Sequence, residues 1–255
     1  MVSTLIQDAR SAVDLNNSGV ACFRAGDRSS AVRLFKLAVS SLIGSLNVED
    51  YEANPSSDTD HDENNGSLDL FRSLSAELQV PLQTDQHSFP EPSVSDYIYV
   101  NPMNLMSSKN AYASDSLVDV TVQSAMVLFN IGLVYHLVGQ DDICSCDESN
   151  IVKAKKLYER ATSLLCNCSS SAYASSGRPV VDILSMAILN NLGAAAHQLN
   201  LYEESEHYLR GLNILASSLR IPDANEEMKD ILRYYQSYFL FNSVSLQPPT
   251  RAPAA

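Results

Sequence analysis

The chain has no tryptophan, and its 255 residues include only nine glycines and ten prolines. Few helix-breaking residues, together with a 45% share of hydrophobic residues, are typical of a mostly helical protein with a real core. The sequence also lacks an unbroken run of 18 apolar residues, so it predicts no membrane span. Its start does not read as a secretory signal. The five cysteines are therefore expected to be reduced thiols, in the cytoplasm or the nucleus.

Basic residues are nearly missing from residues 46–95. Arg72 is the only Lys or Arg in that stretch, which carries most of the net charge of −13. A chain without a basic face is a poor candidate for binding nucleic acid or an anionic membrane. Residues 47–66 contain too few apolar side chains to offset the entropy of ordering, so we expect them to be disordered. A short helix is expected near residues 68–78, and residues 97–100 look extended and prone to form a strand.

The pattern Leu-x-Asn-x-Gly occurs three times, at residues 15–19, 128–132 and 189–193. Small and bulky side chains recur at matching offsets after each copy, once ten extra residues are removed after the second. They are Ala31, Phe35 and Ala38; Ala154, Tyr158 and Ala161; and Ser205, Leu209 and Leu212. A unit that recurs in this way predicts helical hairpins in a repeat array, whose usual work is holding other proteins.

Apolar spacing and helix-stop signals divide the chain along its length. Asp27 is expected to cap the second helix, and Gly139 to end the first helix of the second hairpin. The predicted fold class is all-α, with antiparallel hairpins stacked as a solenoid. Its parts are a first hairpin at 1–45, an acidic insertion at 46–115, a second hairpin at 116–168, a linker and third hairpin at 169–220, a capping helix at 221–242 and a disordered tail at 243–255.

At these residues the chain resembles a tetratricopeptide repeat protein, and its interruptions are similar to those of interrupted-repeat proteins of diatoms. The match covers about 105 of the 255 residues. Unbroken repeats of this family run about 34 residues, whereas 113 residues separate the first two motif glycines here. The resemblance implies that each motif glycine lets the second helix approach closely and that Phe35 and Tyr158 fill the space against the next repeat. Ala31, Ala154 and Ser205 would face Gly19, Gly132 and Gly193.

The resemblance also places the first helix of each hairpin on an inner groove. The aligned asparagines of that face are expected to hydrogen-bond an extended peptide, because an amide offers both donors and an acceptor. The alternative is that they tolerate the groove rim or bond a neighbouring helix. The candidate partner-binding residues are Asn16, Asn17, Val20 and Phe23; Phe129, Asn130, Leu133 and His136; and Asn190, Asn191, Ala194 and His197.

One use of this family grips the acidic tails of heat-shock chaperones with basic residues and asparagines. The corresponding positions here are Asn16, Val20, Asn130, Ala187 and Asn191. Only Asn130 matches, and no cation is present to pair with a terminal carboxylate. Chaperone tails are therefore disfavoured as partners.

Two metal sites are weaker alternatives. The pairs Cys144/Cys146 and Cys166/Cys168 would bind zinc only if they converged across a helix that separates them by roughly 24 Å. The Asp-rich tract at residues 58–69 has carboxylates in calcium-loop register, but Glu63 replaces the glycine of the sharp turn. A solvated acidic tract is the favoured interpretation.

The two groove histidines, His136 and His197, occupy equivalent positions. A histidine pair can bind metal or sense pH. No third ligand accompanies them, so ordinary polar residues on a groove wall are favoured.

No phosphate-binding glycine loop, Ser/His/Asp arrangement or His-Glu metal helix occurs, so we predict no enzyme and no cofactor. The predicted function is an adaptor that binds a partner peptide or domain along its concave face. Two alternatives stay open. One is a metal- or calcium-linked sensor that uses the Cys-x-Cys pairs or the Asp-rich tract. The other is a structural assembly subunit without a groove ligand.

Overall fold

The computed structural model describes residues 2–49, 97–105, 116–141, 149–169, 179–219 and 226–246. These residues form seven helices and one irregular segment, with no strand among them, so the all-α prediction is confirmed for this part of the chain. The helices are α1 (Val2–Arg24), α2 (Arg28–Glu49), α4 (Ser116–Asp141), α5 (Ser149–Ser169), α6 (Pro179–Gln198), α7 (Tyr202–Ser218) and α8 (Glu226–Ser245).

The chain divides into two compact units. The first unit comprises residues 1–87 and 102–134, and the second comprises residues 88–101 and 135–255. Helix α4 and the segment 97–105 each contribute residues to both units.

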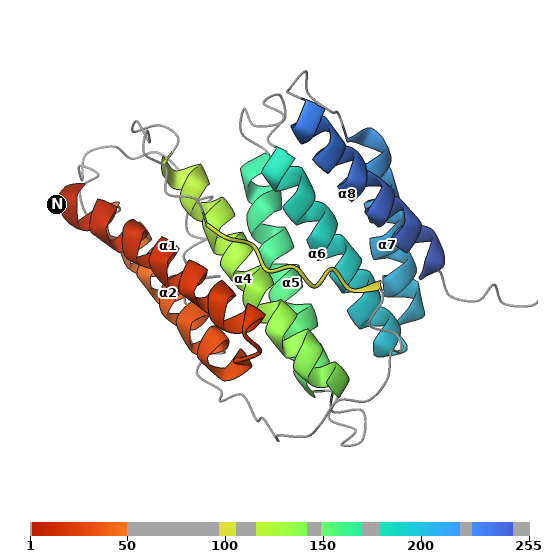
Figure 1. Ribbon diagram of the computed structural model, residues 1–255, viewed down its shortest axis with the longest axis horizontal. Helices are drawn as coiled ribbons and strands as arrows, with labels where there is room; N and C mark the ends of the chain where they lie inside the picture. The colour runs from red at the N-terminus through yellow and green to blue at the C-terminus, as the bar shows by residue number, and fades with distance from the viewer. Residues whose placement is uncertain are drawn as a thin grey trace, which may run out of the picture. The chain divides into compact units, whose positions relative to one another are not determined.

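In the first unit, α1 and α2 form an antiparallel hairpin, drawn in red and orange in Figure 1. Gly26 turns the chain with a φ of +84°, a conformation that residues with a Cβ rarely adopt. Asp27 Oδ1 then accepts the backbone N–H of Ser30 at 3.0 Å, which lowers the pKa of the Asp27 carboxyl. The predicted cap at Asp27 is therefore confirmed. Helix α2 continues to Glu49, beyond the predicted end of the hairpin at residue 45.

The recurring positions of the second helices all lie in the core, at 1% exposure or less, as the repeat pattern predicts for a packed hairpin. The bulky residue of the second helix also lies against the motif glycine, which was not predicted. A Cβ on Gly19 would lie 2.6 Å from Phe35 Cε1, and one on Gly193 would lie 2.7 Å from Leu209 Cδ2. The bulky residue four places after the small one thus presses on the glycine, because side chains lean toward the helix N-terminus. Ser205, the small residue predicted to face Gly193, donates its Oγ–H to the Gly193 carbonyl at 2.8 Å.

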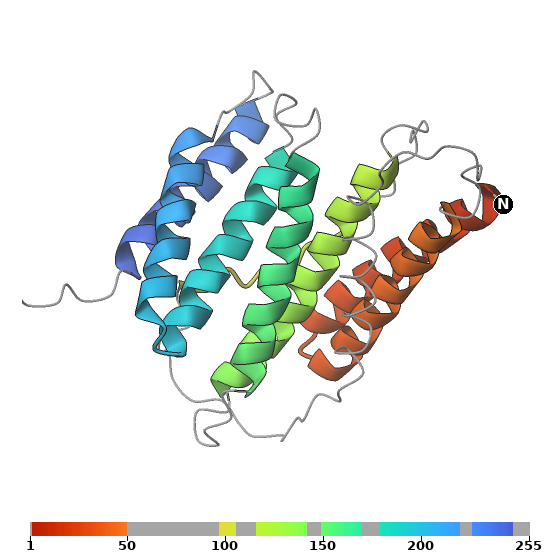
Figure 2. The same cartoon turned by 180° about the vertical axis from the view of Figure 1, so that it is seen from behind.

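In the second unit, α6 and α7 lie side by side and antiparallel, with α5 packed on α6 (Figure 1 and, from behind, Figure 2). Helix α8 packs on both α7 and α6, burying Leu232 and Phe239. Gln236 Nε2 donates to the Ala216 carbonyl of α7 at 2.8 Å. The capping helix predicted at 221–242 is thus present as α8, but it ends at Ser245. Its position brings asparagine and tyrosine side chains beside α6.

Helix α4 does not end at Gly139, as was predicted, but runs on to Asp141. A Cβ at Gly139 would lie 2.7 Å from Ile151 Cγ1 and 3.1 Å from the Ile151 backbone nitrogen. The glycine therefore serves a close approach of α5 to the helix and not a helix stop.

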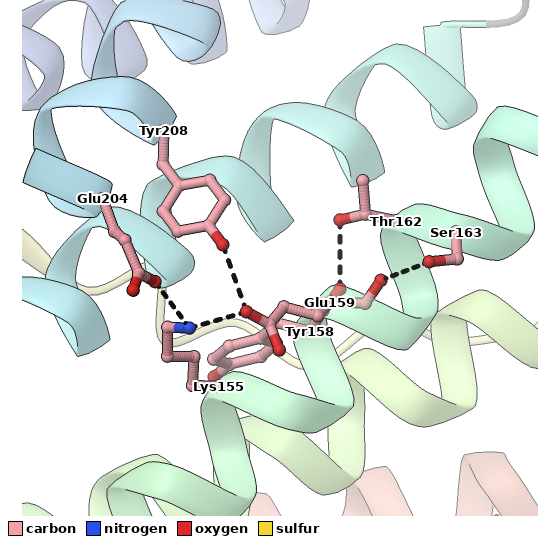
Figure 3. A network of polar contacts seen from close by, with 7 residues as sticks. All are labelled: Lys155, Tyr158, Glu159, Thr162, Ser163, Glu204 and Tyr208. Carbon is pink, nitrogen blue, oxygen red and sulfur yellow. Dashed lines mark hydrogen bonds and ion pairs between the residues drawn. The ribbon is translucent and has the colours of Figure 1, made fainter.

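A polar network joins α5 to α7 on the surface of the second unit (Figure 3). Lys155 Nζ lies 2.6 Å from Glu159 Oε1 and 2.7 Å from Glu204 Oε2, and Tyr208 donates to Glu159 at 3.1 Å. Burial opposes the charge of Lys155, but its hydrogen bonds to the two carboxylates outweigh this and raise the pKa of the ammonium group. Lys155 thus links α5 to α7, because its ammonium group pairs with a carboxylate from each helix.

Two of the described helices, α4 and α6, are long and apolar enough to cross a membrane by length and composition alone. The windows Val120–Gln140 and Val180–Gln198 have mean hydropathies of 1.5 and 1.3, and 89% and 61% of them are buried inside the structure. The core helix of a soluble protein passes the same test. The sequence prediction had required an unbroken apolar run, and residues such as Asn130 and Asn191 interrupt both windows.

Some predictions lie outside the described residues. They concern the disorder expected at residues 50–66 and 247–255, the short helix at 68–78, the Asp-rich tract at 58–69, and Cys144 with Cys146. Residues 47–49 and 243–245, also expected to be disordered, are helical.

Candidate peptide-binding site

The segment 97–105, drawn in yellow in Figure 1, carries the sequence Tyr-Ile-Tyr-Val-Asn-Pro-Met-Asn-Leu. Its first four residues were predicted to be extended and prone to form a strand, but among the described residues no strand forms. Asparagine side chains take the place of a neighbouring strand. They hydrogen-bond the backbone of alternate residues of the segment, in both units.

In the second unit, Asn191 of α6 clamps Tyr99 with two hydrogen bonds. Its Oδ1 accepts the Tyr99 backbone N–H at 2.9 Å, and its Nδ2 donates to the Tyr99 carbonyl at 3.1 Å. Asn190 Nδ2 donates to the Tyr97 carbonyl at 2.7 Å, and Asn242 Nδ2 of α8 donates to the same carbonyl at 3.0 Å. The Asn191 side chain therefore pairs with both the N–H and the carbonyl of Tyr99, as the backbone of a neighbouring strand would.

The Asn191 clamp is supported from behind by a chain of buried hydrogen bonds. Asn191 Nδ2 also donates to the Tyr158 hydroxyl at 3.3 Å, and that hydroxyl lies 3.4 Å from His136 Nδ1. His136 Nε2 lies 3.1 Å from Gln198 Oε1, an atom that only accepts. Nε2 must therefore carry the proton, which leaves Nδ1 as the acceptor for the Tyr158 hydroxyl.

Burial keeps the two titratable side chains of this hydrogen-bond network, His136 and Tyr158, uncharged. His136 and Tyr158 are both fully enclosed. Burial lowers the pKa of His136 to about 4, against a smaller opposing effect of its bond to Gln198. Burial likewise raises the pKa of the Tyr158 hydroxyl. Both side chains are thus neutral near pH 7, which is the state in which their hydrogen bonds are compatible.

An aromatic cluster on α8 encloses the Tyr99 ring. The ring centroid lies 5.5 Å from that of Phe239, 6.0 Å from Tyr235 and 6.2 Å from Tyr238. These separations and the tilted or edge-on angles are favourable for aromatic pairs. The Tyr99 hydroxyl donates to Tyr235 at 3.4 Å, and Tyr238 donates to the Ile98 carbonyl at 3.2 Å. Tyr99 is 5% exposed as a result.

The first unit repeats the clamp. Asn17 of α1 accepts the Leu105 N–H at 2.9 Å and donates to the Leu105 carbonyl at 3.0 Å. Asn130 of α4 accepts the Met103 N–H at 2.8 Å and donates to the Met103 carbonyl at 2.8 Å. Asn16 Nδ2 adds a bond to the Met103 carbonyl at 3.0 Å.

The three asparagines of the Leu-x-Asn-x-Gly motif therefore share one role. Asn17, Asn130 and Asn191 each bind the N–H and the carbonyl of a single residue. The clamped residues are odd-numbered, as expected when every second residue of an extended backbone faces the same side. The motif was predicted to bind an extended peptide of a partner; in the structure its asparagines bind an extended segment of the same chain.

The other predicted groove residues are mostly covered. Those with 3% exposure or less are Asn16, Val20, Phe129, Asn130, Leu133, His136, Asn190, Asn191 and Ala194. Asn17, Phe23 and His197 are half-buried. While the segment is in place, the asparagine amides are engaged by it, and binding of a partner by these residues stays a prediction.

Sequence reasoning missed α8 as part of the site. Asn242 donates to Asn190 Oδ1 at 2.9 Å, just as Asn130 donates to Asn16 Oδ1 at 2.9 Å. The signal was present, because Leu240-Phe241-Asn242 repeats the Leu128-Phe129-Asn130 triplet. Val244 stands where the motif has glycine, so a search for the complete pattern passes over it.

The structure also bears on the metal alternatives. Among the described residues, no group of three or more His, Cys, Asp or Glu side chains could hold a metal ion. His136 is committed to Tyr158 and Gln198, and the His197 ring packs edge-on to Tyr202 at 5.4 Å. Cys166 is an exposed free thiol.

Comparison with family models, curated proteins and solved structures found no match to this chain.

Proposed function

We propose that this protein is a non-enzymatic interaction module, a tetratricopeptide-like array whose asparagines bind the backbone of an extended peptide. The observation that carries the proposal is the two-bond clamp, made by Asn191 on Tyr99 and repeated by Asn17 and Asn130. Backbone recognition of this kind gives affinity without dependence on sequence, and side-chain pockets then supply selectivity.

Because the segment 97–105 already occupies the asparagines, any partner peptide must displace it and replace its hydrogen bonds. Asn190, Asn191 and Asn242 are at most 1% exposed, and each donates to the backbone of the segment. Each amide also donates to a second acceptor, so removing the segment without a replacement would cost it one hydrogen bond, at about 0.5–1.5 kcal/mol net for each bond. These residues therefore favour exchange of one extended backbone for another over an empty state.

The proposal is tested by selecting displayed random peptides on the whole chain and following the bound state by NMR. We expect enriched peptides to shift the side-chain amide signals of Asn191 and Asn130. They should also raise hydrogen exchange of the segment's own residues by displacing it. The control signal is the side-chain amide of Asn213 in α7, which donates to Ser243 of α8. Peptides that bind without moving either clamp signal would place the interaction elsewhere and refute the proposal.

A structural assembly subunit is the second candidate, and one observation favours it. The chain's own segment already satisfies the clamping asparagines, so the fold needs no external ligand. Under this alternative no peptide displaces the segment at any concentration, and hydrogen exchange at the Tyr99 amide stays unchanged in the same experiment.

A further inference from the structure

The second unit presents two kinds of contact to the segment, and they differ in what they can select. The asparagines hydrogen-bond backbone atoms of the segment, which every peptide has. The aromatic cluster on α8, formed by Tyr235, Tyr238 and Phe239, contacts the side chain of Tyr99. The cluster can therefore discriminate between peptides at this position, whereas the asparagines cannot.

We propose that the segment 97–105 occupies the site that a partner peptide would bind. We further propose that the second unit selects an extended peptide with an unmodified aromatic side chain at the position of Tyr99. This inference rests on the proposed function and specifies its ligand. The chain's own segment then acts as a competitor in cis, because its covalent attachment on both sides gives it a high effective concentration.

The fit to an aromatic ring is geometric. Three ring centroids lie 5.5 to 6.2 Å from that of Tyr99, a spacing at which aromatic pairs gain more than an aliphatic side chain of similar area would. The Tyr99 hydroxyl makes one long bond of 3.4 Å to the Tyr235 hydroxyl. A phenylalanine should therefore substitute well, since it keeps the ring contacts and loses a long hydrogen bond.

The cluster also predicts what is rejected. Residues 234–246, which form the C-terminal part of α8 and the residue after it, include no charged side chain. A carboxylate or a phosphorylated tyrosine at this position would be buried against aromatic rings and tyrosine hydroxyls, and residues 234–246 offer no cation to pair with it; Lys229 and Arg233, earlier in α8, already pair with Glu226 and Asp230. The neighbouring Val100 is 42% exposed, so the next position should accept many side chains.

The test uses the full chain with its own anchor weakened by Tyr99→Ala, and Val100→Ala as the matched control. A fluorescent peptide with the sequence of residues 95–101 is titrated into each, and binding is followed by anisotropy. We expect the Tyr99→Ala chain to bind it at least tenfold more tightly than the Val100→Ala chain, whose competitor is intact. Far-UV circular dichroism checks that both chains are folded.

Peptide variants at the position of Tyr99 then test selectivity. We expect phenylalanine to bind within about threefold of tyrosine. Alanine should bind at least tenfold more weakly and phosphotyrosine at least a hundredfold more weakly. Equal binding by the alanine peptide would overturn the aromatic selection while leaving the proposed function intact. If none of the peptides binds the folded Tyr99→Ala chain, both the inference and the proposed function are refuted.

A second format applies if Tyr99→Ala does not fold. Specific protease sites are placed within residues 84–93 and within residues 108–113 of the otherwise natural chain. Cleavage at both converts the segment into a separate peptide held only by its contacts. We expect an excess of the tyrosine peptide to release it, and the alanine peptide to fail, as judged by mass spectrometry after gel filtration. Release by both peptides alike, or by neither, would overturn the inference.

Discussion

Replacing Asn191 by leucine is the sharpest perturbation of the clamp. Leucine has nearly the same shape, but it can neither accept the Tyr99 N–H nor donate to the Tyr99 carbonyl and the Tyr158 hydroxyl. Tyr99 is buried, so its N–H and carbonyl lose this partner without gaining water, whereas the Tyr158 hydroxyl keeps its bond to His136. At about 1–3 kcal/mol for each of the two Tyr99 groups, partly offset by the apolar side chain, we expect a loss of about 3 kcal/mol in the free energy of unfolding.

The loss is measured by urea denaturation followed by far-UV circular dichroism, with hydrogen exchange of the Tyr99 amide as a local readout. The matched control is Asn213→Leu, because Asn213 is half-buried and makes one bond, to Ser243. We expect the control to lose less than about 1 kcal/mol. If Asn191→Leu costs no more than the control and the Tyr99 amide stays protected, the clamp does not hold the segment.

Asn191→Asp separates the accepting role from the donating role. The carboxylate still accepts the Tyr99 N–H, but it repels the Tyr99 carbonyl until a proton restores a donor. Burial should raise the pKa of this aspartic acid in the folded state, so its deficit relative to the natural chain appears as pH rises through the unfolded pKa of about 4. We therefore expect a smaller deficit at pH 4 than at pH 7. A deficit independent of pH would show that donation by Asn191 is unimportant.

Three further predictions test the hairpins and the buried histidine. The pKa of His136 is about 4 in the folded chain and about 6.5 in the unfolded chain. Between these two pH values the unfolded chain therefore binds more protons at His136 than the folded chain does. Stability should therefore rise with pH across that window by up to about 3 kcal/mol, and His136→Gln should flatten this rise in urea midpoints. Gly19→Ala should cost about 1–3 kcal/mol by thermal melting, because its Cβ meets the buried Phe35 ring, whereas Gly211→Ala, with its nearest neighbour at 3.8 Å, should gain up to about 1 kcal/mol. Lys155→Met should cost about 1 kcal/mol in low salt and less in 1 M NaCl; equal costs would show that the ion pairs contribute nothing.

The helical hairpins were predictable because their signals are local. Asp27 caps α2 and Gly26 precedes it, so the turn could be placed from adjacent residues. Gly139 shows the limit of such signals. A glycine near the end of an apolar run can serve a helix stop or a close approach, and only the position of Ile151 shows which applies.

The candidate site was predictable in part. Three asparagines in one repeated motif indicated hydrogen bonding to a partner peptide; the structure shows them bonded to an extended segment of the same chain, and partner binding stays a prediction. The identity of that peptide was not predictable, because the segment 97–105 is far from its clamps in sequence. Asn17 and Leu105 are 88 residues apart, and Asn190 and Tyr97 are 93.

By itself the sequence determined the all-helical class, the hairpins α1–α2 and α6–α7, and the residue types that can hold a peptide backbone. These follow from spacing and side-chain chemistry, which act over a few residues. Tertiary structure decided that Tyr99 and its neighbours fill the clamps, that α8 joins the site through Asn242, and that His136 is a buried neutral link. Those outcomes depend on which distant groups meet and exclude water, and no local pattern in a single sequence specifies that.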